Sequence, residues 1–132
     1  MPQGRCHCGA VRFSVDGEMQ HHAVCHCEDC RRSSGAIMVA WAAFPKDSLT
    51  VESGTPKVYR SSEHGERHFC GQCGTGLFYF NEAMLPGIVD VQSVAFDTAA
   101  EMAPQAHIQV ADSLPWEASL GDLPRFDRYP GP

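Results

Sequence analysis

Three cysteines, Cys25, Cys27 and Cys30, lie close enough in the chain for their sulfurs to reach one metal ion. Two arginines, Arg31 and Arg32, follow them directly. Zinc in proteins takes four tetrahedral ligands, and a site with three protein ligands keeps a place for water or substrate. The spacing therefore predicts a metal site with an open coordination place beside a pair of cations.

The other four cysteines form two separated pairs, Cys6 with Cys8 and Cys70 with Cys73. Two ligands from each of two turns make the usual closed structural zinc site. We therefore expect two zinc ions per chain, one structural and one catalytic or labile. An alternative grouping joins the second pair to two thiols of the middle three. We favour four plus three, because the middle cysteines can bind one ion without closing a long loop.

Seven cysteines can also serve purposes other than metal binding. An odd number leaves a disulfide framework one partner short, and Cys-x-Cys neighbours rarely pair. A redox Cys-x-x-Cys belongs near a βαβ unit, and a zinc deaminase needs His-x-Glu followed by Pro-Cys-x-x-Cys. Buried inert thiols and an iron–sulfur cluster stay open as alternatives. So does a structural second zinc completed by His26, Asp29 or a distant histidine.

Three thiolates donate strongly to a zinc ion, which makes it a poor generator of hydroxide. Such a site suits a soft ligand, and a thiol that coordinates a metal loses its proton. Arg31 or Arg32 would then hold a carboxylate of the thiol in bidentate fashion, unless both face solvent. Glu28 and Asp29 are candidates for proton transfer, with plain solvation as the alternative. The residues predict a thiol substrate rather than hydrolysis.

Three ordered motifs carry a resemblance to a known family: Cys-His-Cys-Gly-Ala-Val-Arg-Phe at 6–13, Cys-His-Cys-x-x-Cys-Arg-Arg-Ser-Ser-Gly-Ala at 25–36 and Phe-Cys-x-x-Cys-Gly-Thr at 69–75. They resemble the glutathione-dependent formaldehyde-activating enzymes, a family that includes centromere protein V. The tail is similar too, with His107-Ile108, Pro115-Trp116 and Leu123-Pro124-Arg125-Phe126.

The resemblance implies an all-β, tent-like zinc fold of short antiparallel sheets. It places the structural zinc on Cys6, Cys8, Cys70 and Cys73, and the catalytic zinc on Cys25, Cys27 and Cys30. The implied activity is formation of S-(hydroxymethyl)glutathione from formaldehyde and glutathione, classed as a carbon–sulfur lyase reaction. The implied partners are therefore a small thiol and a small aldehyde.

A second function class fits the same cysteines, namely a zinc-stabilised module that binds a protein partner without catalysis. The formal net charge is −6, and two thiolate zinc sites of four and three cysteines would lower it to −9. So acidic a chain repels nucleic acid unless its basic residues cluster. We therefore expect no nucleic-acid partner under either function.

The chain of 132 residues is long enough for one domain with its own core, and we expect a single domain over 1–132. No segment approaches the roughly 18 apolar residues of a membrane helix. The first residues lack the apolar run of a signal peptide. We expect a cytoplasmic protein with reduced thiols.

Short alternating segments between Gly and Pro turns predict the strands that must position these cysteines. Residues 11–15 and 19–24 form a hairpin around Asp16-Gly17, which would put both Cys-His-Cys elements on one hairpin system. Residues 36–44 are a buried strand, although a short core helix fits nearly as well. The remaining expectations are strands starting at 49 and over 57–60, 77–80, 88–94 and 107–110, loops over 31–35 and 61–66, a helical turn within 98–104, and a tail after 113 that wraps the body.

Overall fold

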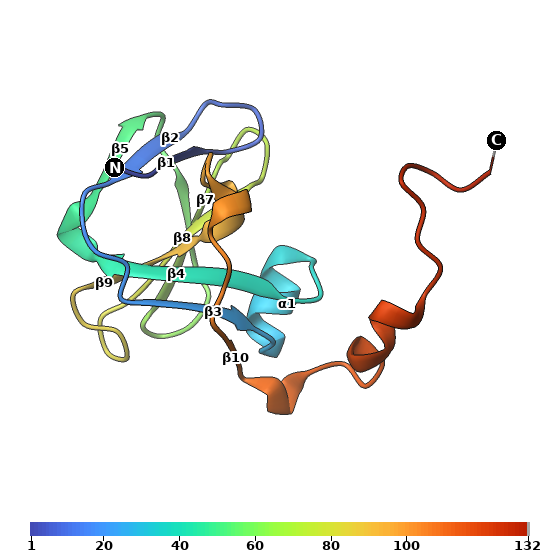
Figure 1. Ribbon diagram of the computed structural model, residues 1–132. Coiled ribbons are helices and arrows are strands. Elements are labelled where there is room, and N and C mark those ends of the chain that lie inside the picture. Colours follow the sequence, from blue (N-terminus) through green and yellow to red (C-terminus); the bar gives the residue numbers. More distant parts are fainter. Residues whose placement is uncertain (132) are drawn as a thin grey trace.

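The structure, a computed structural model, describes residues 1–131 and is built mainly of short β-strands (Figure 1). The strands are β1 (Gln3–Arg5), β2 (Arg12–Val15), β3 (His21–Cys25), β4 (Val39–Pro45), β5 (Leu49–Ser53), β6 (Lys57–Arg60), β7 (Gly65–Phe69), β8 (Gly76–Asn81), β9 (Ile88–Gln92) and β10 (Ala106–Ile108). One α-helix, α1 (Glu28–Ser34), and short 3-10 turns join them: η1 (Lys46–Ser48), η2 (Ser93–Ala95), η3 (Ala99–Glu101), η4 (Val110–Asp112) and η5 (Glu117–Asp122).

The strands form two sheets. The small sheet has the order β1-β2-β5, and the large one has the order β10-β3-β4-β9-β8-β7-β6. Neighbours pair antiparallel except β10, which runs parallel to β3. The all-β prediction of small, mainly antiparallel sheets is confirmed, with that one parallel pair as a departure.

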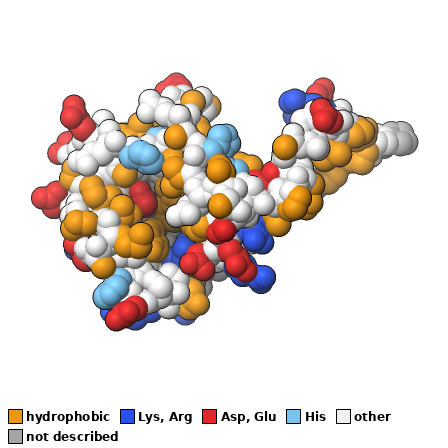
Figure 2. Space-filling model, turned by 90° about the horizontal axis from the view of Figure 1, so that it is seen from below, with side chains coloured by type: hydrophobic (Ala, Val, Ile, Leu, Met, Phe, Trp, Pro, Cys, Tyr) orange, Lys and Arg blue, Asp and Glu red, His pale blue; other side chains and the backbone are white. Residues whose placement is uncertain are grey.

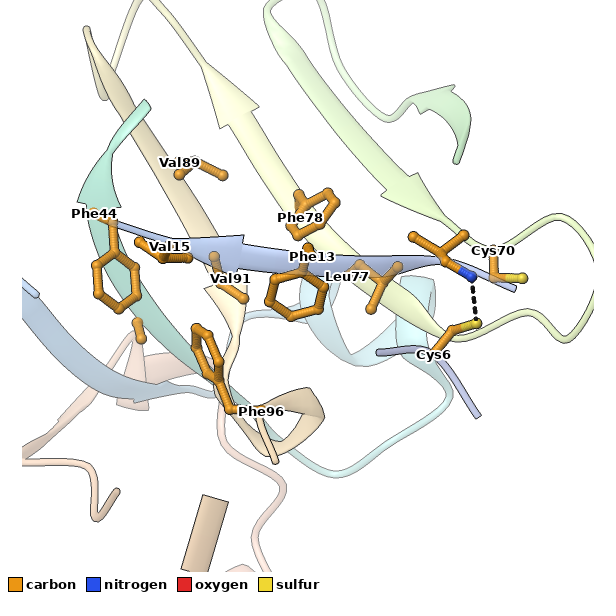
Figure 3. Packing of buried hydrophobic residues seen from close by; sticks show 12 residues of the cluster. Cys6, Phe13, Val15, Phe44, Cys70, Leu77, Phe78, Val89, Val91 and Phe96 are labelled. Carbon is orange, nitrogen blue, oxygen red and sulfur yellow. Dashed lines mark hydrogen bonds between the residues drawn. The ribbon is translucent and has the colours of Figure 1, made fainter. Parts of the chain in front are cut away.

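The main core lies between the two sheets (Figure 3). Phe13 of β2 stands at its centre, with its ring edge-on to Phe78 at 5.1 Å and to Phe96 at 5.4 Å between ring centroids. Gly4 of β1 passes so close to the Phe13 ring that a Cβ there would lie 2.4 Å from it. Alternating residues of β2 therefore face the large sheet, as the period-two pattern predicts.

The predicted hairpin between residues 11–15 and 19–24 is wrong. Strand β2 pairs with β1 and β5 in the small sheet, whereas β3 pairs with β4 and β10 in the large sheet. The chain leaves one sheet at Asp16-Gly17 and enters the other. The buried residues of β2 and those of β3 therefore belong to strands with different partners. The two Cys-His-Cys elements consequently come at the ends of strands of different sheets, β1 and β3.

The other strand predictions are confirmed to within a few residues, and residues 36–44 contain strand β4 rather than a helix. The predicted loop over 61–66 is too long, because β7 begins at Gly65. The sequence predicts a loop over 31–35, which is wrong, because Glu28 to Ser34 form α1. Cys27 caps this helix by accepting a hydrogen bond from the Cys30 N–H, and Gly35 ends it with a φ of 67°. The sequence did not indicate this helix, because Cys27 and Cys30 fit a metal-binding loop as well as they fit a helix N-terminus.

The prediction that the tail wraps the body is also wrong. Asp112 and Glu117 still contact residues of the body. Beyond them the chain leaves the body as an arm, drawn red in Figure 1, with hydrophobic side chains along it in Figure 2. Trp116, Leu123 and Phe126 are 50, 58 and 59% exposed. Large apolar residues between turn residues do not specify a docking surface on the same chain. None of the described helices is both long and apolar enough to span a membrane.

Candidate metal centres

Four sulfurs meet where the turn after β1 lies against the turn after β7. The Sγ atoms of Cys6, Cys8, Cys70 and Cys73 all lie within 4.8 Å of one another. Cys8 is 3.7 Å from Cys6 and 3.8 Å from Cys70, measured between sulfurs. A tetrahedron with metal–sulfur bonds of about 2.3 Å has edges of about 3.8 Å. The sulfurs are therefore already spaced for a four-thiolate metal site.

Backbone amides and a hydroxyl point at these sulfurs. The Val11 N–H donates to Cys6 Sγ at 3.3 Å, and the Cys73 N–H donates to Cys70 Sγ at 3.5 Å. The hydrogen bond from the Thr75 hydroxyl is the main cause that lowers the pKa of Cys73 to about 5. Such donors stabilise thiolates, the form in which cysteine binds metal.

The second cluster is built by the end of β3 and the start of α1. The Sγ atoms of Cys25, Cys27 and Cys30 also lie within 4.8 Å of one another. Cys25 and Cys30 are buried, whereas Cys27 is partly exposed. The structure thus groups the seven cysteines as four plus three and does not bring Cys70 to the middle cluster. That these groups bind metal stays a prediction.

Burial is the main cause that raises the pKa of Cys25 to about 12, and it also raises the pKa of Cys30. Neighbouring thiols raise both further, because two thiolates repel each other. A divalent cation would supply the missing positive charge, since a coordinating thiol is deprotonated outright. The donor set therefore suits a soft metal ion, with one place left for another ligand in a tetrahedron.

An arginine that sequence reasoning missed touches this cluster. Arg67 of β7 places its Nη1 and Nη2 atoms 3.9 and 3.8 Å from Cys30 Sγ. Its guanidinium lies over the Tyr79 ring, 4.9 Å from the centroid. Its Nε is buried and has no hydrogen-bond partner within residues 1–131. The alternation of β7 before Cys70 was the available signal, since it puts Arg67 and Phe69 on one face.

The two arginines singled out from the sequence are placed differently. Arg32 is exposed and bonds Glu28 one helical turn away, with 2.9 Å between Nε and Oε1. Arg31 is half-buried, and its charge acts on Glu117. Glu28 and Asp29 lie in the first turn of α1 rather than in a loop. That Arg31 or Arg32 holds a substrate carboxylate stays a prediction.

His26 is buried between two of the clustered cysteines, yet its ring bonds other residues. Its Nδ1 lies 2.7 Å from Glu117 Oε1, and its Nε2 lies 2.8 Å from His107 Nδ1. With both ring nitrogens engaged, His26 does not complete the second cluster. Sequence reasoning left His107 unassigned and did not consider Glu117. Their link to His26 spans more than 80 residues of chain.

A cleft of about 850 Å³ adjoins the second cluster. Val39 and Trp41, which pack against Cys25 and Cys30, line it together with Arg67. Ser34 at the end of α1 and Thr75 beside the first cluster lie on its walls. The cleft therefore runs between the two cysteine clusters, and Arg67 stands where it meets the second.

The family model for "Glutathione-dependent formaldehyde-activating enzyme" matches residues 1–112. The chain belongs to this family. A putative glutathione-dependent formaldehyde-activating enzyme of Halomonas elongata is 30% identical over 126 residues, which cover 86% of this chain and 78% of that protein. An uncharacterized lyase of Schizosaccharomyces pombe is 34% identical over 77 residues, or 58% of this chain and 56% of the relative.

A solved structure of a Rhodobacter sphaeroides protein has the same fold. It aligns with a TM-score of 0.65 and 23% identity, covering 80% of this chain and 98% of that one. The family match, the mostly β architecture and the two cysteine clusters agree with the tent-like fold expected from the motifs. The chain spans about half the length of several relatives it matches.

Proposed function

We propose that this protein is a zinc-dependent enzyme of the carbon–sulfur lyase type. It joins a small thiol, glutathione or one like it, to a small aldehyde, as in the formation of S-(hydroxymethyl)glutathione, and also catalyses the reverse cleavage. One observation carries the proposal. The cluster of Cys25, Cys27 and Cys30 offers three buried or half-buried sulfurs and no fourth ligand from His26.

We assign the two zinc ions by the number of sulfurs that each cluster offers, four in the first and three in the second. Cys6, Cys8, Cys70 and Cys73 would hold a structural ion that ties the small sheet to the β7 turn. Cys25, Cys27 and Cys30 would hold the second ion, which when bound lowers the pKa of a coordinating thiol and orients its sulfur. The names of the family and of the Halomonas relative support the thiol and the aldehyde.

The protein's own residues orient the reactants. Arg67 touches the edge of the second cluster and carries free donor capacity, which suits an oxygen that becomes negative during the addition. Arg31 and Arg32 follow Cys30 in the last turn of α1, where they would hold a carboxylate of the thiol. We further propose that residues 1–132 act as one domain in the cytoplasm, where free thiols and reduced cysteines persist.

A second function, a zinc-stabilised module that binds a protein partner without catalysis, is favoured by the exposed arm. Trp116, Leu123 and Phe126 offer the kind of apolar anchors that protein interfaces use. Both functions can share the structural cluster. They differ in whether the second cluster accepts a thiol.

The test is the exchange rate between free formaldehyde and S-(hydroxymethyl)glutathione at equilibrium, followed by nuclear magnetic resonance with carbon-13 formaldehyde. The zinc-loaded protein should accelerate exchange above the spontaneous rate. Cys27→Ser, which removes one ligand of the second cluster, should abolish the acceleration. Met84→Ser, an exposed change in the turn between β8 and β9, should keep it. No acceleration by the zinc-loaded parent leaves the binding module as the better account.

A further inference from the structure

The cleft beside the second cluster has a chemistry that formaldehyde and glutathione do not explain. Arg67 lines it and stands directly opposite Tyr59 on β6 and Tyr79 on β8. Phe78 of the main core also lines the cleft, so the core closes one side of it. Met38, Tyr59 and Val94, which line it elsewhere, do not belong to the main core.

Its walls are mostly apolar. Large apolar side chains line it, among them Met38, Val39, Trp41, Tyr59, Phe69 and Phe78. Among the described residues that line it, Arg67 alone carries a permanent charge. Formaldehyde has no carbon chain to fill about 850 Å³. Glutathione is a peptide with two carboxylates and an ammonium group, whereas the described lining offers one permanent cation and no carboxylate.

The charge of Arg67 defines one end of the ligand. Its guanidinium is held by the Tyr79 ring and lies beside Cys30, while its buried Nε lacks a partner within the described chain. Arg67 lines the cleft, so its guanidinium is the cation that an oxygen anion entering the cleft would meet. The site is therefore complementary to an apolar body that ends in one anionic oxygen group.

We infer that the cleft binds the apolar substituent of an aldehyde larger than formaldehyde, with the aldehyde oxygen at Arg67. This inference rests on the proposed function. When the thiol sulfur adds to the aldehyde carbon, the carbon–sulfur bond forms and the carbon–oxygen π bond breaks. The oxygen gains the electron pair and takes up the proton that the thiol has lost, which gives a hemithioacetal without oxidation or reduction. Arg67 donates to that oxygen while it is negative.

Binding is tested without turnover, using straight-chain carboxylates as stable probes of an apolar chain with an anionic end. Calorimetry on the zinc-loaded protein should show the dissociation constant falling roughly threefold to fourfold per added methylene from acetate to hexanoate. Hexanoate should bind at least about tenfold more tightly than hexanol, because only the former pairs with a cation. Equal affinities for acetate and hexanoate would overturn the inference.

Two variants locate the binding. Arg67→Met should remove the preference for hexanoate over hexanol and keep the dependence on chain length. Ala36→Trp, at the exposed rim of the cleft, should remove the dependence on chain length. Ala100→Trp, an exposed change on η3 outside the cleft, is the matched control and should bind hexanoate like the parent. Bound zinc per chain is counted for each variant, and hexanoate binding unaltered by Ala36→Trp would place the ligand elsewhere.

Turnover separates this inference from the function on which it rests. With one thiol, kcat/KM should be higher for hexanal than for formaldehyde in the parent, and Ala36→Trp should reverse that order. Catalysis with formaldehyde but no binding of hexanoate would overturn the inference and leave the proposed function intact. Chain-length-dependent binding without any turnover would support the ligand class of the cleft and reject the function.

Discussion

His26 and Glu117 are joined by a contact of 2.7 Å between Nδ1 and Oε1, although 91 residues of chain separate them. Burial raises the pKa of Glu117, but hydrogen bonds from the Leu114 N–H and from His26 outweigh it, so the pKa lies below its usual value. Glu117 is therefore an anion at neutral pH, held against the loop that carries Cys25 and Cys27. The base of the arm therefore contacts the histidine that lies between Cys25 and Cys27.

Replacing Glu117 with alanine should weaken the second cluster selectively. The ring of His26 loses its partner at Nδ1 and keeps only His107 at Nε2, so the two flanking cysteines become less ordered. Loss of such supporting contacts typically lowers metal affinity by about tenfold or more. Competition with a chelator should show that loss for one ion per chain and none for the other. Glu101→Ala, exposed on η3, is the control and should release both ions like the parent.

The grouping of the cysteines predicts how single substitutions change the zinc content. Cys8→Ser should remove the ion of the four-cysteine cluster, and Cys27→Ser should remove that of the three-cysteine cluster. Each variant should retain one zinc per chain by elemental analysis, where the parent has two. A single substitution that removes both ions from a protein still folded by circular dichroism would mean that the clusters are not independent.

The main core should be sensitive at Phe13, which is 1% exposed and packs on rings from the large sheet and from the segment after η2. Phe13→Ala should lower the free energy of unfolding by roughly 3–4 kcal/mol, through lost burial and the cavity left behind. Denaturant unfolding of the zinc-loaded protein measures it. Val58→Ala on the exposed edge strand β6 should cost well under about 1 kcal/mol.

Asp90 on β9 gives a prediction for pH. Burial raises its pKa to about 6, with His21 opposing the shift. The native state then holds this proton more tightly than the unfolded state, so the contribution of Asp90 to stability falls as the pH rises from about 4 through about 6. Asp90→Asn removes that loss. Its stability gain over the parent should grow by about 1 kcal/mol between pH 5 and pH 8.

The pH series is read as a difference between the zinc-loaded variant and the zinc-loaded parent, which cancels effects common to both. Asp47→Asn, on the exposed turn η1, is the control and should show no growing gain. A gain from Asp90→Asn that is constant with pH would mean that Asp90 keeps its ordinary pKa in the folded protein.

Much of the fold was accessible from local sequence signals. The alternation around Phe13 and the apolar run that contains β4 predicted strands correctly, because burial of one or both faces leaves a direct pattern in the sequence. The sheet to which each strand belongs was not accessible. Asp16-Gly17 looks the same in a hairpin turn and in a crossing between sheets, and only the distant partners of β2 and β3 distinguish the two.

The site divides in the same way. The spacing of the cysteines predicts two clusters of four and three, and the structure groups them in that way. Spacing does not indicate Arg67 or Glu117, because their contacts with Cys30 and His26 join segments far apart in the chain. A lone arginine in a strand and a lone glutamate in a tail carry no local signature. Arg31 and Arg32 are predicted to bind substrate only because they directly follow Cys30 in the sequence.

The central claim is that the second cluster binds a metal and leaves one place for a substrate thiol. The direct measurement is the absorption spectrum of the cobalt-substituted protein during titration with glutathione. We predict a saturable rise in thiolate-to-cobalt charge transfer as a further sulfur coordinates, absent in Cys27→Ser. A spectrum that does not change at millimolar glutathione would contradict the claim and leave the cluster a structural site.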